Sequence, residues 1–291
     1  MVFLVPAILV LIAAWNVLAY RKSSYYQVTK IPMLQLYADK GRLGEYRTFK
    51  HLRSAEKNGA KFLFNIYIPK GENETTEIDV LMIHAKGLFV FESKNYSGWI
   101  FGSEHQKNWY QTLPQGRGRS HKAAFYNPVM QNRTHIKHLK TLLGEEVPMH
   151  SIVTFSERCT LKKVEITSGD VQVINRDRVY QTVAEVCGKM DAPALEQARI
   201  DEIYATLYPY TQVDAAAKAK HIEHIEKNLE KAEQPPAVST AEKSAICPRC
   251  GGALTLRTAS RGANAGRQFY GCSNYPKCRY IRNLEMEEVQ L

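Results

Sequence analysis

The sequence predicts an α/β domain flanked by two smaller parts, an apolar N-terminal helix and a short cysteine-rich module at the C-terminus. Three observations lead to this prediction. An uncharged, mostly apolar run covers residues 2–19, strand and helix patterns alternate from about residue 41, and four of the six cysteines fall within residues 247–278. A hydrophobic content of 44% is normal for a globular protein and excludes disorder throughout the chain.

The N-terminal run predicts a membrane anchor. As a helix, its eighteen residues span about 27 Å, which is close to the thickness of the hydrocarbon core. Arg21 and Lys22 follow directly and no Lys or Arg precedes the run, so we expect a single pass through the inner (cytoplasmic) membrane, with the N-terminus outside and the bulk of the chain cytoplasmic. A cleaved signal peptide is the alternative, because residues 17–19 resemble a cleavage site, but a charged segment before the run is missing.

The central region predicts the order helix, three strands, helix, strand. Asn127 and Pro128 are typical of an N-cap and a first helical residue, and the polar, Gly-containing stretch 97–126 is expected to be a loop. The expected elements are a helix over 41–57, strands over 62–68, 77–83 and 88–94, a helix over 128–143, strands over 151–155 and 171–174, and a helix over 178–189.

Positive charge is concentrated in two blocks. The formal net charge is +10 and the pI is about 9.2, which favours a polyanionic partner. Residues 105–144 and residues 244–283 each contain seven Lys or Arg residues and no Asp or Glu. Two basic blocks without acidic residues favour nucleic acid as the partner more strongly than a diffuse excess would.

Four cysteines at the C-terminus predict a zinc site. Cys247 and Cys250 form one pair, Cys272 and Cys278 form a second, and each pair can hold one side of a tetrahedral Zn²⁺. The segment is too small for a large hydrophobic core, so the metal is expected to supply its folding energy. Aromatic residues alternate with cations after residue 266, which suits single-stranded nucleic acid, although a purely structural or protein-docking ribbon is the alternative. The other two cysteines, Cys159 and Cys187, are expected to be ordinary thiols.

Acidic residues on the second and third strands predict a catalytic metal site. If His84 pairs with Gly87 across the turn, Asp79 faces Glu92, and Lys94 lies on the same face as Glu92. Two nearby carboxylates favour a cation between them, and Mg²⁺ or Mn²⁺ is the usual one. The spacing alone also fits a solvated face with a cross-strand ion pair.

A further carboxylate, Glu45, lies on the apolar side of the first helix, with Phe49 and Leu52 at positions i+4 and i+7. A carboxylate on that side needs a partner, and the same metal could supply it.

Two segments resemble known families. Residues 247–254 and 269–278 resemble the C-terminal zinc fingers of bacterial type IA topoisomerases, which bind DNA. Gly44-Glu45, residues 77–79 and 87–98, Trp109 and residues 127–131 resemble the nuclease-related domain (NERD) family, which is assigned to the PD-(D/E)xK nuclease superfamily.

The NERD resemblance implies a restriction-endonuclease-like (αβββαβ) core. It also implies metal binding at Asp79 and Glu92, water activation with Lys94, and a supporting role for Glu45. Trp109 and Gln131 are expected to contact the substrate, with packing as the alternative.

Taken together, the sequence predicts a membrane-anchored nuclease that hydrolyses DNA with Mg²⁺ or Mn²⁺ and binds nucleic acid through a structural Zn²⁺ ribbon. A non-catalytic, membrane-tethered nucleic-acid-binding protein is the alternative, and the ribbon and the Ala-, Lys- and Glu-rich segment 214–233 could also dock proteins. The expected substrate-binding residues are Trp109, Gln131, Arg117, Arg119, Lys122, Arg267, Phe269, Tyr270, Tyr275 and Lys277. The expected division is a transmembrane anchor (1–20), a juxtamembrane linker (21–37), a NERD nuclease-like domain (38–190), a helical extension (191–233), a linker (234–245) and a zinc ribbon (246–283).

Overall fold

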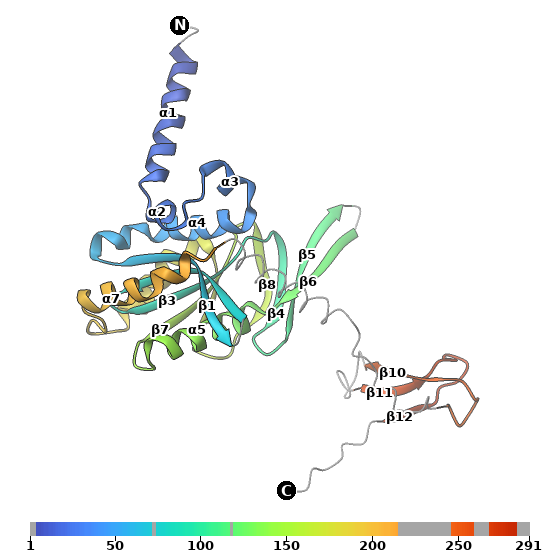
Figure 1. Cartoon of the computed structure of the whole chain (residues 1–291). Helices are drawn as coiled ribbons and strands as arrows, with labels where there is room; N and C mark the ends of the chain where they lie inside the picture. The colour runs from blue at the N-terminus through green and yellow to red at the C-terminus, as the bar shows by residue number, and fades with distance from the viewer. Residues whose placement is uncertain (1–3, 72–73, 117–118, 215–245, 259–267, 284–291) are drawn as a thin grey trace. The chain divides into compact units, whose positions relative to one another are not determined.

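The computed structural model describes residues 4–71, 74–116, 119–214, 246–258 and 268–283 (Figure 1). The chain divides into two compact units, Met1–His224 and Ile225–Leu291. The predicted helix over 214–233 and linker over 234–245 fall almost entirely on residues 215–245, which lie outside the described residues.

A five-stranded sheet forms the core of the first unit, with the strand order β1-β2-β3-β7-β9. Strands β1, β2 and β3 pair antiparallel, whereas β7 runs parallel to β3 and β9 runs parallel to β7. The strands are β1 (Lys61–Gly71), β2 (Glu74–His84), β3 (Gly87–Lys94), β7 (Met149–Phe155) and β9 (Val171–Asn175).

Helices cover both faces of this sheet. Helix α4 (Lys40–Leu52) brings Gly44 against Ser93, while α5 (Pro128–Leu143) brings Gln131 to the neighbouring Lys94. Because successive side chains of a strand point to opposite faces, α4 and α5 lie on opposite faces of β3, as Figure 1 shows.

The predicted α/β class is therefore confirmed, but the predicted order of helix, three strands, helix, strand is incomplete, because three further strands lie between β3 and α5. The remaining elements of this unit are η1 (Arg53–Asn58), η2 (Arg176–Arg178), α6 (Val179–Gly188), α7 (Gln197–Leu207) and η3 (Tyr208–Thr211).

A second, four-stranded sheet with the order β6-β5-β4-β8 replaces the loop that we predicted over 97–126, so that prediction is wrong. Its strands are β4 (Gly98–Ser103), β5 (Asn108–Gly116), β6 (Arg119–Tyr126) and β8 (Cys159–Glu165). The inward face carries Ile100, Trp109 and Phe125, which form a hydrophobic cluster with residues of β7. The polar residues that suggested a loop lie mainly on the exposed face and along the outer half of the hairpin.

The N-terminal helix α1 (Leu4–Arg21) does not meet the requirements of a membrane span. Within the described part of the chain, no helix combines the length and the apolar character needed to cross a bilayer. The physical reason lies in the end of α1, where Arg21 is charged and Tyr20 is committed to the protein core at 2% exposure. The predictions of a transmembrane anchor, of a membrane partner and of a single-pass location in the inner membrane are therefore wrong.

The segment that we predicted as a linker, residues 21–37, is part of the fold. It contains α2 (Ser24–Thr29) and most of α3 (Met33–Ala38), and it buries Tyr25, Val28 and Leu36. Tyr25 packs on Phe64 of β1 with 4.7 Å between the ring centroids. These apolar contacts extend the core of the first unit beyond the predicted start of the domain.

The second unit contains a small antiparallel sheet with the order β10-β11-β12. Its strands are β10 (Leu254–Thr258), β11 (Gln268–Cys272) and β12 (Ile281–Asn283). The buried residues at its centre are Cys247, Cys272 and Cys278, and among the described residues Leu254 and Tyr280 pack around them. Such a core has too little apolar surface to fold the unit without additional bonding.

Candidate active site

The β2–β3 hairpin has the register that its sequence predicted. His84 pairs with Gly87, and the pairing continues without a bulge to Val80 opposite Phe91. Asp79 comes next on β2, and its Oδ2 accepts a hydrogen bond from the backbone N–H of Ser93 at 2.7 Å. Asp79 is thereby held beside the last residues of β3.

Glu92 and Lys94, two residues apart on β3, form an ion pair. The Lys94 Nζ lies 2.6 Å from Glu92 Oε1 and donates a second hydrogen bond to Gln131 Oε1 at 3.1 Å. Glu92 is 1% exposed, whereas the Lys94 side chain keeps 17% of its surface in solvent. The structure thus gathers Glu92, Lys94 and Gln131, three of the predicted site residues, on the face of β3 that α5 covers.

The second oxygen of Glu92 is differently placed. Its Oε2 is buried, has no hydrogen-bond partner among the described residues, and lies 3.6 Å from Nδ1 of His135. His135 lies four residues after Gln131 on α5, so both side chains are on one side of the helix. This spacing is the signal that could have added His135 to the candidate residues. A buried carboxylate oxygen without a donor is costly unless a cation or a proton compensates it.

Burial makes the two carboxyl groups hard to ionise together. Burial, followed by the charge of Glu92, raises the pKa of Asp79 well above its usual range, and burial also raises the pKa of Glu92. Burial alone would lower the pKa of Lys94, but the negative charges of Glu92, Tyr96 and Asp79 together outweigh it and the net shift is upward. Lys94 therefore stays charged while the two carboxyl groups compete for ionisation.

The donor set at Asp79 and Glu92 fits a hard divalent ion. Mg²⁺ usually keeps several waters and binds through one or two carboxylates, so these two side chains suffice as protein ligands. Among the described residues, the cysteines of the second unit are the one group of three or more candidate ligands whose donor atoms lie within 4.8 Å of one another. Asp79 and Glu92 could therefore serve as the two protein ligands of such an ion.

Glu45 occupies a neighbouring position with partners of its own. Its Oε2 accepts hydrogen bonds from Nδ2 of Asn65 at 2.8 Å and from the Tyr25 hydroxyl at 3.3 Å. Burial, followed by the charge of Glu77, raises the pKa of Glu45 to about 8. The residue lines a cleft of about 390 Å³ whose polar walls also include Glu77 and Arg42.

Asn65 reaches Glu45 because the backbone of β1 is interrupted there. Its φ of 50° lies in the left-handed region, which Asn tolerates better than most residues, and the recorded pairing with β2 passes from Phe64 to Ile66. Sequence reasoning missed both Asn65 and Tyr25. Neither residue has a local signal. Asn65 lies within a strand-like pattern, and Tyr25 lies in the segment that we predicted as a linker.

Trp109 is packed in the core of the second sheet. It is fully buried, donates its Nε1–H to the Ser103 carbonyl at 2.9 Å, and stacks on Phe155 with an interplanar angle of 2°. Its ring therefore offers no surface to a ligand in this structure, which fits the packing alternative.

The basic block 105–144 divides into engaged and exposed cations. Arg133 forms two hydrogen bonds with Asp170, at 2.9 and 2.8 Å, and Lys140 pairs with Glu145 at 2.9 Å. Arg119 and Lys122 are exposed on β6, while Arg117 lies outside the described residues. Lys107, before β5, and Lys137, on α5, are exposed as well, so the exposed positive charge of this block is shared between the β5–β6 hairpin and its neighbours.

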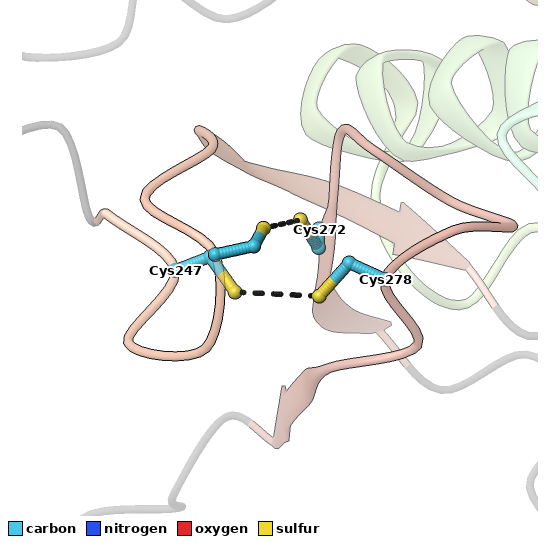
Figure 2. A group of neighbouring side chains, drawn as sticks. Cys247, Cys272 and Cys278 are labelled. Atoms are coloured by element: carbon cyan, nitrogen blue, oxygen red, sulfur yellow. Dashed lines mark hydrogen bonds between the residues drawn. The ribbon is translucent and has the colours of Figure 1, made fainter.

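The four C-terminal cysteines come together as a metal site of the zinc-ribbon type. The Sγ atoms of Cys247 and Cys278 are 3.7 Å apart and those of Cys250 and Cys272 are 3.4 Å apart, as Figure 2 shows for the three labelled residues. A tetrahedral Zn²⁺ with Zn–S bonds of about 2.3 Å separates its sulfurs by about 3.8 Å. The spacing therefore fits Zn²⁺ and is far too long for disulfides.

Backbone and amide N–H groups support these sulfurs. The backbone N–H of Asn274 lies 3.4 Å from the Cys272 Sγ, and the Asn274 side-chain amide lies 3.6 Å from the Cys250 Sγ. Gly251, directly after Cys250, has a φ of 70°, which lets the chain turn so that its N–H donates to the Cys247 carbonyl at 2.9 Å. The other two cysteines, Cys159 and Cys187, lie in the first unit.

The predicted aromatic and basic residues of the ribbon are partly exposed. Tyr275 is 60% exposed, Phe269 and Tyr270 are half-buried, and Lys277 is exposed. Arginines lie over two of the rings, with Arg257 at 6.0 Å from the Tyr275 centroid and Arg282 at 5.0 Å from that of Tyr270. Arg267 lies outside the described residues.

Comparison with known proteins identifies both segments. Residues 40–156 match the family described as nuclease-related domain, and residues 244–287 match the topoisomerase DNA-binding C4 zinc finger. The recognition of both families from the sequence motifs is therefore confirmed.

The relatives divide along the same lines. The chain is 29% identical to an uncharacterised protein of Bacillus anthracis over 192 residues, which are 66% of this chain and 86% of the relative. It is 46% identical over 52 residues to DNA topoisomerase 1 of Methanocaldococcus jannaschii, which is 18% of this chain but 6% of the relative. A third relative, DNA topoisomerase 1 of Campylobacter jejuni, is 26% identical over 48% of this chain and 19% of its own length. No solved structure matches the chain.

Proposed function

We propose that this nuclease-related domain is a metal-dependent nuclease that hydrolyses phosphodiester bonds of DNA, and that the zinc ribbon of the same chain binds the nucleic acid. The observation that carries the proposal is the arrangement on β2 and β3, where Asp79, Glu92 and Lys94 are held together. Glu92 Oε2 is buried without a hydrogen-bond donor, which supports a cation at this position.

Asp79 and Glu92 are the proposed ligands of a divalent ion, Mg²⁺ or Mn²⁺. Once bound, the ion would neutralise charge on the scissile phosphate and lower the pKa of a bound water. Lys94 keeps its proton because of Glu92, so it can donate a hydrogen bond to an anionic oxygen of the substrate. Gln131 accepts from Lys94 and thereby fixes the direction of the Nζ group.

Glu45 is proposed as a supporting carboxyl group. With a pKa of about 8 it is mostly protonated at neutral pH, and it can take up or release a proton as charge changes nearby. Asn65 and Tyr25 hold its carboxyl group in one orientation, which is a positioning role.

The ribbon is proposed to hold the DNA with the exposed side chains of Tyr275 and Lys277, together with Arg257 and Arg282. Rings beside cations bind single strands by stacking and by phosphate contacts. The match to a topoisomerase DNA-binding finger supports this role.

The test uses the full chain with closed circular DNA in Mg²⁺, in Mn²⁺ and in EDTA. Asp79→Asn and Glu92→Gln preserve size while removing the charge, and each is expected to lower cleavage at least 100-fold, because metal binding then fails. Glu185→Gln is the matched control, since Glu185 is exposed on α6, where its Oε1 accepts a hydrogen bond from Gln181 at 2.8 Å. Normal cleavage by either site variant would refute the proposed centre.

A non-catalytic nucleic-acid-binding protein is the second candidate. The 2.6 Å ion pair between Glu92 and Lys94 favours it, because such a pair can serve packing alone. In that case the unaltered chain binds DNA but leaves the circles intact in both metals.

A further inference from the structure

The outer face of the second sheet carries aromatic residues that belong to neither hydrophobic core. Side chains alternate along β4 and β5, so the inward positions of Ile100 and Trp109 send Trp99, Phe101 and Tyr110 to the other face. In the described part of the chain, none of these three rings packs with either hydrophobic cluster of the first unit. Trp99 is 42% exposed.

The rings lie side by side on the two central strands of that sheet. Phe101 is directly opposite Tyr110, and Trp99 is opposite Thr112. On the far side of β5, Tyr110 is opposite Ala124. The small neighbours Thr112 and Ala124 leave space beside the larger rings, so a flat ligand could lie against them.

Lysines border this aromatic surface on both edges of the sheet. On the β6 edge, the Nζ of Lys122 lies 3.9 Å from the centroid of Tyr110, and on the β8 edge the Nζ of Lys162 lies 5.9 Å from that of Trp99. Glu165, also on β8, is paired with Lys163 at 3.4 Å. The surface thus combines one exposed ring, that of Trp99, and two half-buried rings with net positive charge.

We propose that this surface, formed by Trp99, Phe101, Tyr110, Lys122 and Lys162 and called here the aromatic platform, binds single-stranded nucleic acid. Unpaired bases expose their ring faces and can stack on the aromatic side chains, while the lysines contact the phosphates. A duplex hides its base faces in the helical stack, so it cannot use the rings.

The platform follows the candidate active site closely along the chain. β3 ends at Lys94 and β4 begins at Gly98, so three residues connect the proposed catalytic strand to the first strand of the platform. Figure 1 shows the β5–β6 hairpin extending away from the five-stranded sheet. That the bound strand is the one to be cut rests on the proposed function, whereas the binding itself does not.

Tryptophan fluorescence of the full chain tests the platform separately from the ribbon. The chain has three tryptophans, at positions 15, 99 and 109, so the ribbon has none. In a Trp15→Phe background, emission comes from Trp99 and from Trp109, which is completely buried. Titration with a 20-nucleotide oligo(dT) in EDTA should quench the emission, and a duplex of mixed sequence should leave it unchanged.

Substitutions then assign the contacts. Tyr110→Ala should weaken single-strand binding roughly 5- to 100-fold, whereas Tyr110→Phe should bind normally because it keeps the ring. Tyr180→Ala is the matched control, since Tyr180 is 60% exposed on α6. Lys122→Gln should reduce the slope of log affinity against log salt by about 0.7, and Lys189→Gln, an exposed lysine just after α6, should have no effect.

Binding of oligo(dT) without quenching, equal quenching by the duplex, or normal affinity of Tyr110→Ala would overturn the proposal. Because EDTA prevents metal-dependent cleavage, these results do not depend on the nuclease. Quenching by a chain that cuts no DNA in Mg²⁺ or Mn²⁺ would keep the platform and reject the proposed function. Cleavage of DNA without quenching would keep the proposed function and reject the platform.

Discussion

Replacing Glu45 by Gln should change how the stability of the first unit depends on pH. The folded protein raises the pKa of Glu45 from 4.5 to about 8, chiefly by burial. The folded state therefore binds a proton more tightly at this group than the unfolded state does. Its contribution is fully present below about pH 4.5 and is lost as the pH rises through 8.

The expected magnitude follows from the size of this shift. Within that window, each pH unit should remove about 1.4 kcal/mol of the free energy of unfolding, and the loss over the whole window approaches about 5 kcal/mol. Gln cannot ionise, but its side-chain oxygen can accept the same hydrogen bonds from Asn65 and Tyr25. The free energy of unfolding of Glu45→Gln should thus fall less steeply with pH than that of the unaltered chain. The difference in slope should be about 1.4 kcal/mol per pH unit between pH 5.5 and 7.5.

Urea unfolding followed by tryptophan fluorescence measures this directly. All three tryptophans belong to Met1–His224, so the signal comes from the first unit and not from the ribbon. The free energy of unfolding should be determined for both proteins in EDTA at several pH values from 5 to 8.5. Glu185→Gln provides a control for the loss of an exposed carboxylate.

If the free energy of unfolding changes with pH at the same rate in the unaltered chain and in Glu45→Gln, the reasoning is refuted. Such a result would mean that Glu45 is already ionised at pH 5 in the folded protein. In that event the cleft beside Glu77 must be better solvated, or better supplied with positive charge, than the described contacts imply.

Three further perturbations test other parts of the structure. Removing zinc with a strong chelator, or replacing Cys272 by Ser, should unfold the ribbon and leave the tryptophan-monitored unfolding unchanged, which circular dichroism and fluorescence together can show. Asn127→Ala should destabilise the first unit by about 2–4 kcal/mol in urea, because the Asn127 side chain caps α5 and also donates to three loop carbonyls. Gly102→Ala places a methyl group 2.3 Å from the Trp109 ring, so a loss of about 1–3 kcal/mol and a shift of the tryptophan emission are expected; an unchanged spectrum would contradict this packing.

The elements that local patterns determine were predicted well. The turn after His84 fixes the hairpin register. Gly87, which has a φ of 114°, closes the turn and pairs with His84. The N-cap Asn127 and the following Pro128 gave the start of α5 correctly. In both places the interacting residues lie within a few positions of one another along the chain, so a local sequence pattern is sufficient to predict them.

The second sheet could not be predicted in this way. Its outer strand β8 pairs with β4 although about 60 residues separate Gly98 from Cys159, and its inward residues find partners on α5, β7 and β9. Without those partners, the stretch 97–126 has the composition of a loop. The contacts that make it a sheet are nonlocal.

The N-terminal segment was misread for a related reason. Hydropathy counts the apolar residues before Arg21 but cannot show that the folded core already includes Tyr20. Tyr20 is buried and donates its hydroxyl to the Ile31 carbonyl at 2.8 Å. Tyr25 supports Glu45, so the segment is connected to the candidate site as well as to the core.

The two oxygens of Glu92 give the strongest argument for a cation at the site. Lys94 satisfies Oε1 and carries one positive charge, which cannot balance both Glu92 and Asp79 when the two are ionised. Without a metal, the site must therefore keep a proton, either on one of the two carboxyl groups, whose raised pKa values favour this, or on His135, whose Nδ1 lies 3.6 Å from Oε2. A divalent ion would displace that proton and complete the coordination of Oε2. Metal binding should consequently release protons and tighten as the pH rises, and calorimetric titration in buffers of different ionisation enthalpy would detect the release. If the metal binds with no proton release between pH 6 and 8, the carboxyl groups are already ionised and the charge balance argued from Lys94 is incorrect.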